Sequence, residues 1–311
     1  MNFLSITDID IPKALSLAEK VKKNPEAYKH ALDGLSLAAI FEKPSTRTKL
    51  SFNVGISQLG GFFADLGDSH ILGGHEDEHD TVNSIAQYAD FVLMRVNAHS
   101  SLSKWAAHSP IPIINGLSEE EHPCQALADL LTISELKGMK GVKVAYIGDA
   151  NNVCNSLLLG CAALGIELAI AAPPKYAPHS AMLEKAGALA AKSGSKISVT
   201  AKPELAVQDA DVVYTDVWVS MGQEKEKAEK MKAFSGFCVT SELMAKAKPN
   251  AIFMHCLPAQ KGLEVTKEVL EGKQSVVFAQ AANRLHAQKA VMLMLAEAAK
   301  QKAAVIAGVE S

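Results

Sequence analysis

Short apolar runs separated by amphipathic segments recur along this chain, and they restrict its fold more than any other feature. In the second half, four such runs begin at Val142, Glu167, Asp211 and Ala251, and each ends in polar residues or proline. Continuous apolar runs of this length are typical of parallel strands buried on both faces. Because helix-like segments separate them, we predict βαβ units and an α/β fold.

The first half shows the same alternation, and the length of 311 residues favours two domains. Strands are predicted at residues 34–43, 91–96 and 110–116, and helices at 48–60, 81–89 and 123–136. We assign residues 1–135 and 136–311 to two domains, each a mainly parallel sheet flanked by helices. A last helix, about residues 282–300, carries the apolar stripe VMLML and is expected to pack back on the first domain.

Charge and cysteine usage exclude several classes of partner. The 31 basic and 34 acidic side chains give a net charge of -3, so there is no basic field for nucleic acid and no polybasic membrane anchor. No apolar run approaches the roughly 20 residues that span a bilayer, and the N-terminus lacks a basic signal region. Five scattered cysteines indicate free thiols in a reducing compartment. We therefore expect a cytoplasmic protein.

The strongest local signal is the run Ser45, Thr46, Arg47 and Thr48, between a predicted strand and a predicted helix. Hydroxyls, free backbone N–H groups and a guanidinium would converge there at a helix N-terminus, which favours an anion. In isolation the same run would be read as a helix cap followed by a solvated basic turn. The chain has neither G-x-x-x-x-G-K-[ST] nor G-x-G-x-x-G, so those nucleotide phosphate cradles are unsupported.

Three further residues in the first half are candidates for the same site. His122 and Gln125 fall near the first turn of a predicted helix, where they could polarise a carbonyl group or bind an amide. A histidine there is more often a cap or a core residue. Arg95 ends a predicted strand and would face the crevice at that sheet edge, unless it is simply the first exposed residue.

In the second half, three predicted strands end in polar residues of different kinds. The first is followed by the amide pair Asn151 and Asn152, the next by Asp216, and the last by Cys256. Each ending alone suits an ordinary turn or helix cap. Three of them on one edge of a parallel sheet predict a pocket for a polar ligand.

The segment from His75 to His79 matches H-E-x-x-H, in which two histidines one helical turn apart bind zinc. Here it follows two glycines, and its middle residues are acidic, whereas a zinc-binding helix of this kind is normally buried. We interpret the segment as a charged loop and expect no metal, although a zinc hydrolase stays open as an alternative.

Taken together, these motifs resemble those of the aspartate/ornithine carbamoyltransferase family. The likeness runs from FEKPSTRT near Phe41 to ANRLHAQKA near Ala290, with S-T-R-T and H-P-x-Q in the family's order. Within that family, D-x-W-x-S-M-G, here residues 216–222, and H-C-L-P, here residues 255–258, mark the ornithine branch. N-N-V-x-N-S at residues 151–156 agrees with that branch.

The resemblance implies two α/β domains around a cleft, assembled as a homotrimer or a multiple of trimers. It implies transfer of a carbamoyl group from carbamoyl phosphate to the side-chain amine of L-ornithine, without metal or organic cofactor. The carbamoyl phosphate site would then comprise Ser45, Thr46, Arg47, Thr48, Arg95, His122, Gln125 and Arg284. The ornithine site would comprise Asn152, Asp216, Ser220, Met221, Cys256 and Leu257, and the catalytic residues would be Arg95, His122, Asp216 and Cys256.

Three positions depart from the family pattern. Ile71 stands where a glutamine usually reaches a neighbouring subunit, Asp77 replaces a serine, and Ala282 replaces a glutamate. These changes keep two alternatives open: transfer to another amine, such as putrescine or an acylated ornithine, and a silent relative that only binds or assembles. The sequence does not distinguish arginine synthesis from arginine breakdown, or a trimer from a larger, cooperative assembly.

Overall fold

The computed structural model describes residues 1–68, 76–220, 222 and 224–306. The chain divides into two compact units. The first unit comprises Met1–Leu131 together with the chain from Asn283 onward, and the second comprises Thr132–Ala282. Over the described part of the chain, no helix is both long enough and apolar enough to cross a membrane.

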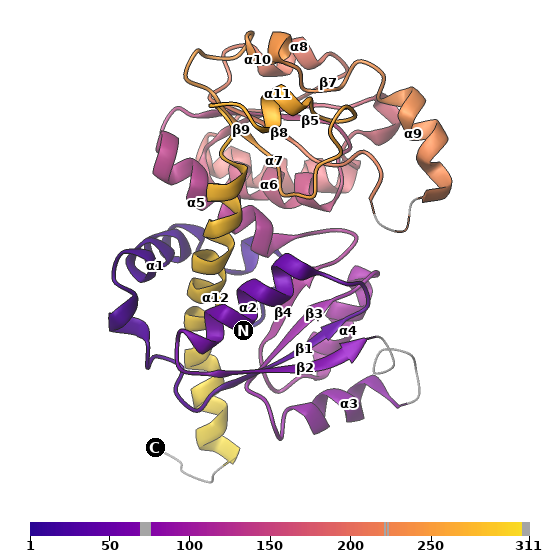
Figure 1. The fold of residues 1–311 in the computed structure, drawn as a ribbon. Coiled ribbons are helices and arrows are strands. Elements are labelled where there is room, and N and C mark those ends of the chain that lie inside the picture. Colours follow the sequence, from indigo (N-terminus) through magenta and orange to yellow (C-terminus); the bar gives the residue numbers. More distant parts are fainter. Residues whose placement is uncertain (69–75, 221, 223, 307–311) are drawn as a thin grey trace. The chain divides into compact units, whose positions relative to one another are not determined.

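The first unit is built on a parallel sheet in the order β2-β1-β3-β4 (Figure 1). Its strands are β1 (Ser36–Phe41), β2 (Phe62–Asp68), β3 (Phe91–Arg95) and β4 (Ile113–Leu117). The helices are α1 (Ile11–Lys23), α2 (Thr46–Ser57), α3 (Glu78–Ile85) and α4 (His99–His108), with α5 (Pro123–Lys137) starting here and ending in the second unit. Short 3-10 turns lie at Ile6–Asp8 and Pro25–Tyr28.

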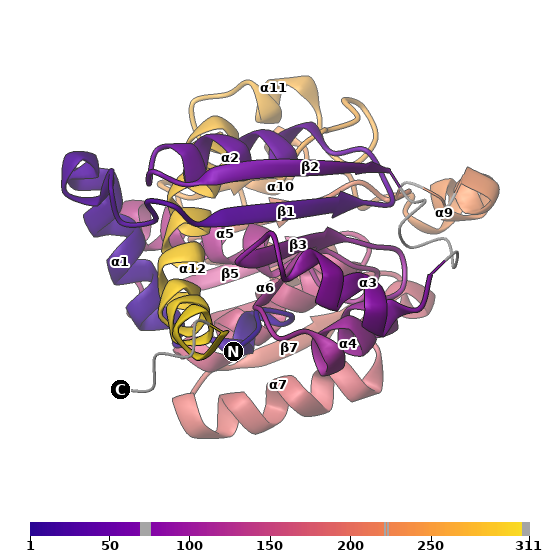
Figure 2. The same cartoon turned by 90° about the horizontal axis from the view of Figure 1, so that it is seen from below.

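The strands of this sheet that the sequence predicted are those whose side chains are buried. The strands predicted at residues 34–43, 91–96 and 110–116 are present as β1, β3 and β4, whose apolar side chains are buried. On one face, α3 and α4 cover β1 and β3 through a shared apolar cluster (Figure 2). Strand β2 was not predicted, because it is an edge strand interrupted by aspartate and glycine, and its Phe62 is 68% exposed.

The last helix, α12 (Val277–Ile306), begins five residues before the predicted start near 282. From Asn283 onward it belongs to the first unit, as the predicted return to the first domain requires. It packs closely on α2, where a Cβ on Gly55 would lie 3.3 Å from Met292 Cε and 3.5 Å from Leu285 Cδ1. Gly55 therefore permits the two helices to approach each other.

The second unit contains a parallel sheet in the order β7-β6-β5-β8-β9. Its strands are β5 (Lys143–Ile147), β6 (Glu167–Ala171), β7 (Ile197–Thr200), β8 (Val212–Thr215) and β9 (Ile252–Met254). Figure 1 shows α6 (Asn152–Leu164) and α7 (Ser180–Ser193) on one side of this sheet. On the other side lie α8 (Pro203–Val207), α10 (Ser241–Met244) and α11 (Lys267–Leu270), which share the main apolar core of the unit.

Four of these strands, β5, β6, β8 and β9, are those that the sequence predicted. The edge strand β7 was missed, since two of its four residues are exposed and its sequence, ISVT, is only half apolar. The remaining elements are the helix α9 (Lys227–Ala233) and the short 3-10 turns at Pro174–Tyr176 and Glu224–Glu226.

In each sheet, the strands that follow the first strand are added on one side of it and then on the other. In the first unit, β1 lies between β2 and β3; in the second, β5 lies between β6 and β8. In open parallel sheets of this kind, ligands bind outside the carboxyl ends of the strands that flank this change of side. The residues after β1 and β3, and those after β5 and β8, are therefore where a site is expected.

Candidate active site

In the first unit, the segment after β1 forms the start of α2. Ser45 has an extended backbone, and its Oγ accepts a hydrogen bond from Thr48 N at 3.3 Å, as an N-cap residue does. Thr46 is exposed, Arg47 is half-buried and Thr48 is buried. The first turn of α2 thus presents backbone N–H groups and hydroxyls together with the Arg47 guanidinium, a combination suited to an anion.

Arg284, on α12, joins two of the other predicted residues. Its Nη1 donates to Gln125 Oε1 at 2.6 Å, and its Nη2 donates to Thr48 Oγ1 at 3.0 Å. Gln125 is held in turn, because its Nε2 donates to Asp129 Oδ1 at 2.8 Å. Arg284 is only 3% exposed, so these contacts fix a guanidinium inside the first unit.

His122 is buried near enough to three arginines for their charges to act on it. Burial is the main cause that places its pKa well below the usual 6.5; the charges of Arg284, Arg95 and Arg47 lower it further. The imidazole is therefore neutral near pH 7 and can donate one hydrogen bond without adding charge. Arg95 ends β3 in register with Phe41, the last residue of β1, at the expected edge of the sheet.

The neighbouring Cys124 differs in chemistry from these residues. It is fully buried, its Sγ donates to Asn115 O at 3.3 Å, and burial raises its pKa to about 12. A thiol of this kind is inert as a nucleophile. Cys124 therefore belongs to the core that supports His122 and not to the reacting groups.

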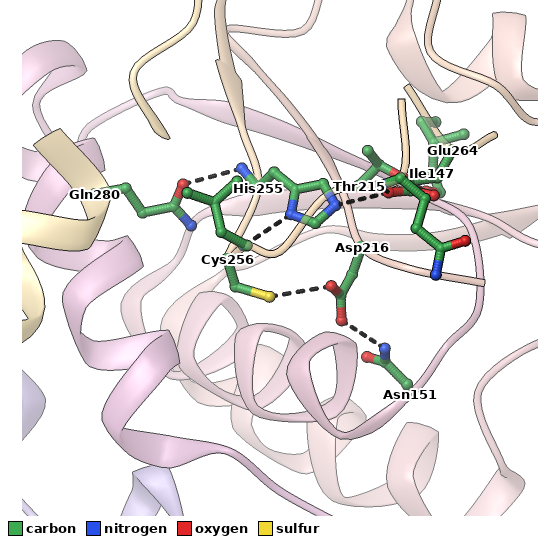
Figure 3. Close-up of polar contacts among 10 residues, drawn as sticks. Ile147, Asn151, Thr215, Asp216, His255, Cys256, Glu264 and Gln280 are labelled. Atoms are coloured by element: carbon green, nitrogen blue, oxygen red, sulfur yellow. Dashed lines mark hydrogen bonds and ion pairs between the residues drawn. The ribbon is translucent and has the colours of Figure 1, made fainter. Parts of the chain in front are cut away.

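In the second unit, three strand ends meet at Asp216 (Figure 3). Asn151 Nδ2 donates to Asp216 Oδ2 at 2.7 Å, and Cys256 Sγ donates to Asp216 Oδ1 at 3.0 Å. These residues follow β5, β8 and β9, at the carboxyl edge of the sheet. The structure thus brings Asp216 and Cys256 together and adds Asn151, which the sequence had suggested only as part of an amide pair.

Asn151 also explains how α6 begins at this site. Its Oδ1 accepts from Val153 N at 3.0 Å and from Cys154 N at 3.2 Å, which caps the helix. One side chain therefore caps α6 through its oxygen and holds the Asp216 carboxylate through its nitrogen. Asn152 follows as the first residue of α6 and is half-buried.

Cys256 owes its position to a buried polar arrangement that the sequence motifs did not reveal. His255 Nδ1 accepts from Leu257 N at 2.8 Å, so its proton is on Nε2, which lies 3.3 Å from Glu264 Oε1. His255 N donates to Gln280 Oε1 at 2.9 Å (Figure 3). Leu257 has a φ of 59°, a conformation that a branched side chain rarely adopts and that these contacts stabilise.

Two other predicted residues of the ornithine site are placed less directly. Ser220 and Leu257 are half-buried in the segments that follow β8 and β9. Met221 and Ile71 lie outside the described residues. Ala282, one of the departures from the family pattern, is exposed at the end of the second unit.

His75 of the histidine-rich segment lies outside the described residues, and the part from Glu76 onward leads into α3. Asp77 caps α3 by accepting a hydrogen bond from His79 N at 2.8 Å, so Glu76 and Asp77 precede the helix. The described part of H-E-x-x-H is therefore not the continuous helix that a zinc motif of this type needs. Both Asp77 and His79 are exposed.

Two groups of described residues have ligand atoms that all lie within 4.8 Å of one another, as a metal site needs. They are Asp77, His79 and Asp80, and Asp216, His255 and Cys256. In the first group His79 Nδ1 lies 3.0 Å from Asp80 Oδ1, and all three side chains are exposed. In the second group the ligand atoms already make hydrogen bonds within the protein, including the one from Cys256 Sγ to Asp216.

Comparison with known proteins gives a consistent result over both units. The model of the aspartate/ornithine carbamoyltransferase carbamoyl-P binding domain matches residues 1–135, and that of the Asp/Orn binding domain matches residues 140–295. The ornithine carbamoyltransferase of Methanoculleus marisnigri is 46% identical over 301 residues, covering 94% of this chain and 96% of that protein.

Solved structures agree. Ornithine carbamoyltransferase from Pyrococcus furiosus is similar with a TM-score of 0.90 at 43% identity, covering 95% of this chain and 97% of that one. Anabolic ornithine carbamoyltransferase from Campylobacter jejuni gives a TM-score of 0.89 at 42% identity, covering 95% and 99%. Because the family models and these relatives span nearly the whole chain, the chain belongs to the aspartate/ornithine carbamoyltransferase family.

Proposed function

We propose that this chain transfers the carbamoyl group of carbamoyl phosphate to the side-chain amine of L-ornithine, giving L-citrulline and phosphate. The observation that carries this proposal is the convergence of Arg47, Arg95 and Arg284 on the neutral, buried His122. Three guanidinium groups around an uncharged hydrogen-bond donor suit a small molecule with a dianionic end and an amide-like end.

The phosphate of the first substrate binds at the start of α2. Ser45, Thr46, Arg47 and Thr48 hold its oxygens through hydroxyls, backbone N–H groups and the arginine fork. Arg95 and Arg284 supply further positive charge. Support comes from the buried Arg284, whose contacts with Thr48 and Gln125 fix its orientation.

The carbamoyl end of that substrate binds beside His122 and Gln125. When an amine adds to the carbamoyl carbon, negative charge grows on the carbonyl oxygen. His122, Arg95 and the Thr48 hydroxyl stabilise that charge. A neutral His122 is appropriate here because it donates a hydrogen bond and does not compete with the arginines for the phosphate. Arg95, His122, Asp216 and Cys256 are the catalytic residues of this proposal.

Ornithine binds to the second unit. Asn152, Ser220, Met221 and Leu257 contact its α-amino acid end, and its side-chain amine lies by Asp216 and Cys256. An ammonium group has no free lone pair, so the amine loses a proton before or during its approach. The Asp216 carboxylate, already hydrogen-bonded to Asn151 and Cys256, attracts the amine and assists that loss.

The Cys256 thiol has a positioning task in this scheme. Its Sγ–H donates to Asp216 Oδ1, which keeps one oxygen of the carboxylate oriented while the other is held by Asn151. No covalent intermediate is needed, because the substrate amine is itself the nucleophile. Phosphate leaves into the basic pocket around Arg47, and the main contributions to rate are positioning and charge.

The proposal includes a setting for the enzyme. We expect a cytoplasmic homotrimer or multiple of trimers that serves arginine biosynthesis and has no nucleic-acid or membrane partner. Free cysteines and the absence of strong net charge support this setting. Size measurement by light scattering, at several protein concentrations, tests the trimer independently of activity.

The experiment that tests the function is citrulline formation from carbamoyl phosphate with ornithine, run beside putrescine, N-acetylornithine and aspartate. We expect a strong preference for ornithine, lost in Arg47→Ala and in Asp216→Ala and retained in Lys192→Ala, which alters an exposed lysine on α7. Turnover of another amine alone would keep the phosphate site but overturn the assignment of ornithine. Turnover of none of these amines would favour the silent relative.

A further inference from the structure

We infer that Lys230, through a buried ion pair with Asp149, is a positioning residue for the amino-acid substrate, because it ties together the two segments that carry the ornithine contacts. The inference rests on the proposed function and goes beyond it, since neither Lys230 nor Asp149 belongs to the motifs of the site. Both residues lie in the second unit.

The pair is short and removed from solvent. Lys230 Nζ lies 2.5 Å from Asp149 Oδ2, and the two side chains are 2% and 10% exposed. Lysine is seldom buried to this degree without a partner. Two opposite charges withdrawn from water keep each other in place, because separating them would leave an uncompensated charge in the interior.

Asp149 belongs to the segment that presents the amides of the site. It directly follows Gly148, at the end of β5, and it precedes Asn151 and Asn152. The backbone O of Asp149 accepts two hydrogen bonds, one from Tyr146 Oη at 2.9 Å and one from Asn151 N at 2.8 Å. Fixing Asp149 therefore fixes the backbone from which Asn151 reaches Asp216.

Lys230 belongs to the other segment, which continues the chain beyond Ser220. It lies on α9, the first α-helix after Ser220 in the described chain. Phe234, directly after α9, stacks on Trp218 with ring centroids 5.5 Å apart, so the chain returns to the place it left. Contacts of described residues therefore hold the chain on both sides of Ser220: Trp218 stands two residues before it, and Lys230 and Phe234 come after it.

Tyr176 connects the two segments a second time. Its ring lies 5.3 Å from Lys230 Nζ and 5.0 Å from the Phe234 ring, while its backbone O accepts from Ala150 N at 3.0 Å. The aromatic contacts pack α9 on the unit but do not fix its exact position. The ion pair does so, since it holds Lys230 Nζ of α9 against Asp149 Oδ2 of the amide segment.

A role in stability alone makes a different prediction. Buried ion pairs are poor stabilising devices, and apolar replacements are often tolerated well. If Lys230 only fastened α9, replacing it would alter unfolding but not the substrate constants. If Lys230 instead positions Ser220, Lys230→Met raises the KM for ornithine. The KM for carbamoyl phosphate stays unchanged, because that substrate binds to the first unit.

The test compares Lys230→Met with Lys227→Met, which replaces an exposed lysine on the same helix. We expect the ornithine KM to rise about tenfold or more in Lys230→Met, with the carbamoyl phosphate KM within about twofold of wild type. Lys227→Met should match wild type in both constants. Asp149→Asn should resemble Lys230→Met, and the double variant should be no worse than either, because both single changes remove one interaction.

A second readout does not depend on turnover. The chain has two tryptophans, Trp105 and Trp218, so Trp105→Phe leaves Trp218 as the reporter near Ser220. In that background, Lys230→Met should shift the Trp218 emission to longer wavelength as water reaches the released segment, and Lys227→Met should not. The double variant, without either buried charge, provides the same comparison if Lys230→Met alone does not fold.

The outcomes separate the two claims. If wild-type protein forms citrulline but Lys230→Met keeps both the wild-type ornithine KM and the wild-type emission, the positioning role is wrong while the proposed function stands. Equal increases in both KM values would also overturn it, since they indicate general damage. If wild-type protein does not use ornithine, the proposed function is wrong, and the role assigned to Lys230 in binding that substrate is lost with it.

Discussion

Arg284 Nη2 donates a hydrogen bond to Thr48 Oγ1 across 3.0 Å, although 236 positions separate the two residues in the chain. The contact brings the last helix of the protein to the start of α2, where the anion site is proposed. It lies on the part of the C-terminal helix that belongs to the first unit. Without Arg284, His122 would be influenced by two guanidinium groups instead of three.

This contact predicts a selective loss of carbamoyl phosphate binding. Arg284→Gln removes a buried positive charge and should raise the KM for carbamoyl phosphate by about tenfold to a hundredfold, with a much smaller effect on the KM for ornithine. Thr48→Val keeps the shape of the side chain but removes the hydroxyl that contacts Arg284, so it should also weaken the binding of carbamoyl phosphate. Initial-rate kinetics with each substrate varied in turn measure both.

Thr48→Ser is the matched control for this prediction, since it retains the hydroxyl and should stay within about threefold of wild type. An unchanged carbamoyl phosphate KM in both Arg284→Gln and Thr48→Val would show that this cluster is structural.

His122 should make stability depend on pH. Its pKa in the folded protein lies well below the usual 6.5, chiefly because of burial. Just below pH 6.5, His122 therefore binds a proton in the unfolded chain but not in the folded one. The resulting contribution to the free energy of unfolding is fully present above pH 6.5 and is lost progressively as pH falls below it. Urea unfolding between about pH 7 and pH 5 should therefore be less steeply dependent on pH in His122→Gln.

The slope with pH, and not the absolute stability, decides this prediction, because His122→Gln also changes packing. Identical slopes in wild type and His122→Gln would contradict the neutral, buried state assigned to His122.

The hydrogen bonds to Asp216 predict an order of effects on catalysis. Asp216→Asn removes the charge that attracts the amine and should lower kcat by about two orders of magnitude or more. Cys256→Ser keeps a donor to Asp216 Oδ1, so its kcat should fall less than that of Cys256→Ala. Steady-state kcat with both substrates saturating provides the measurement.

A covalent role for the thiol would abolish that difference, because the serine and alanine variants would then be equally inactive. Mass spectrometry of the protein during turnover offers a second check, and we expect no mass increase from a carbamoyl group on Cys256.

Removal of metal should have no effect on turnover. The exposed group Asp77, His79 and Asp80 makes contacts that an N-cap and a surface helix account for. Dialysis against a chelator should therefore leave citrulline formation unchanged, and so should His79→Ala. Loss of activity on chelation, restored by stoichiometric zinc, would instead support the zinc hydrolase and refute this interpretation.

The local chemistry of the site could be found from the sequence. The S-T-R-T run, the His122 turn, Asp216 and Cys256 each follow or precede an apolar run, and the order of parallel strands brings such endings to one edge. Edge strands were harder to find, because β2 and β7 are partly exposed and lack a continuous apolar pattern.

What supports these residues was decided only by tertiary structure. Glu264 and Gln280 hold His255, and Lys230 meets Asp149, although no short motif contains either set. Apolar periodicity reports which face of an element is buried, since burial acts on every residue of that face. A buried polar contact instead depends on where two distant segments meet, because a single pair of atoms must come within hydrogen-bonding distance.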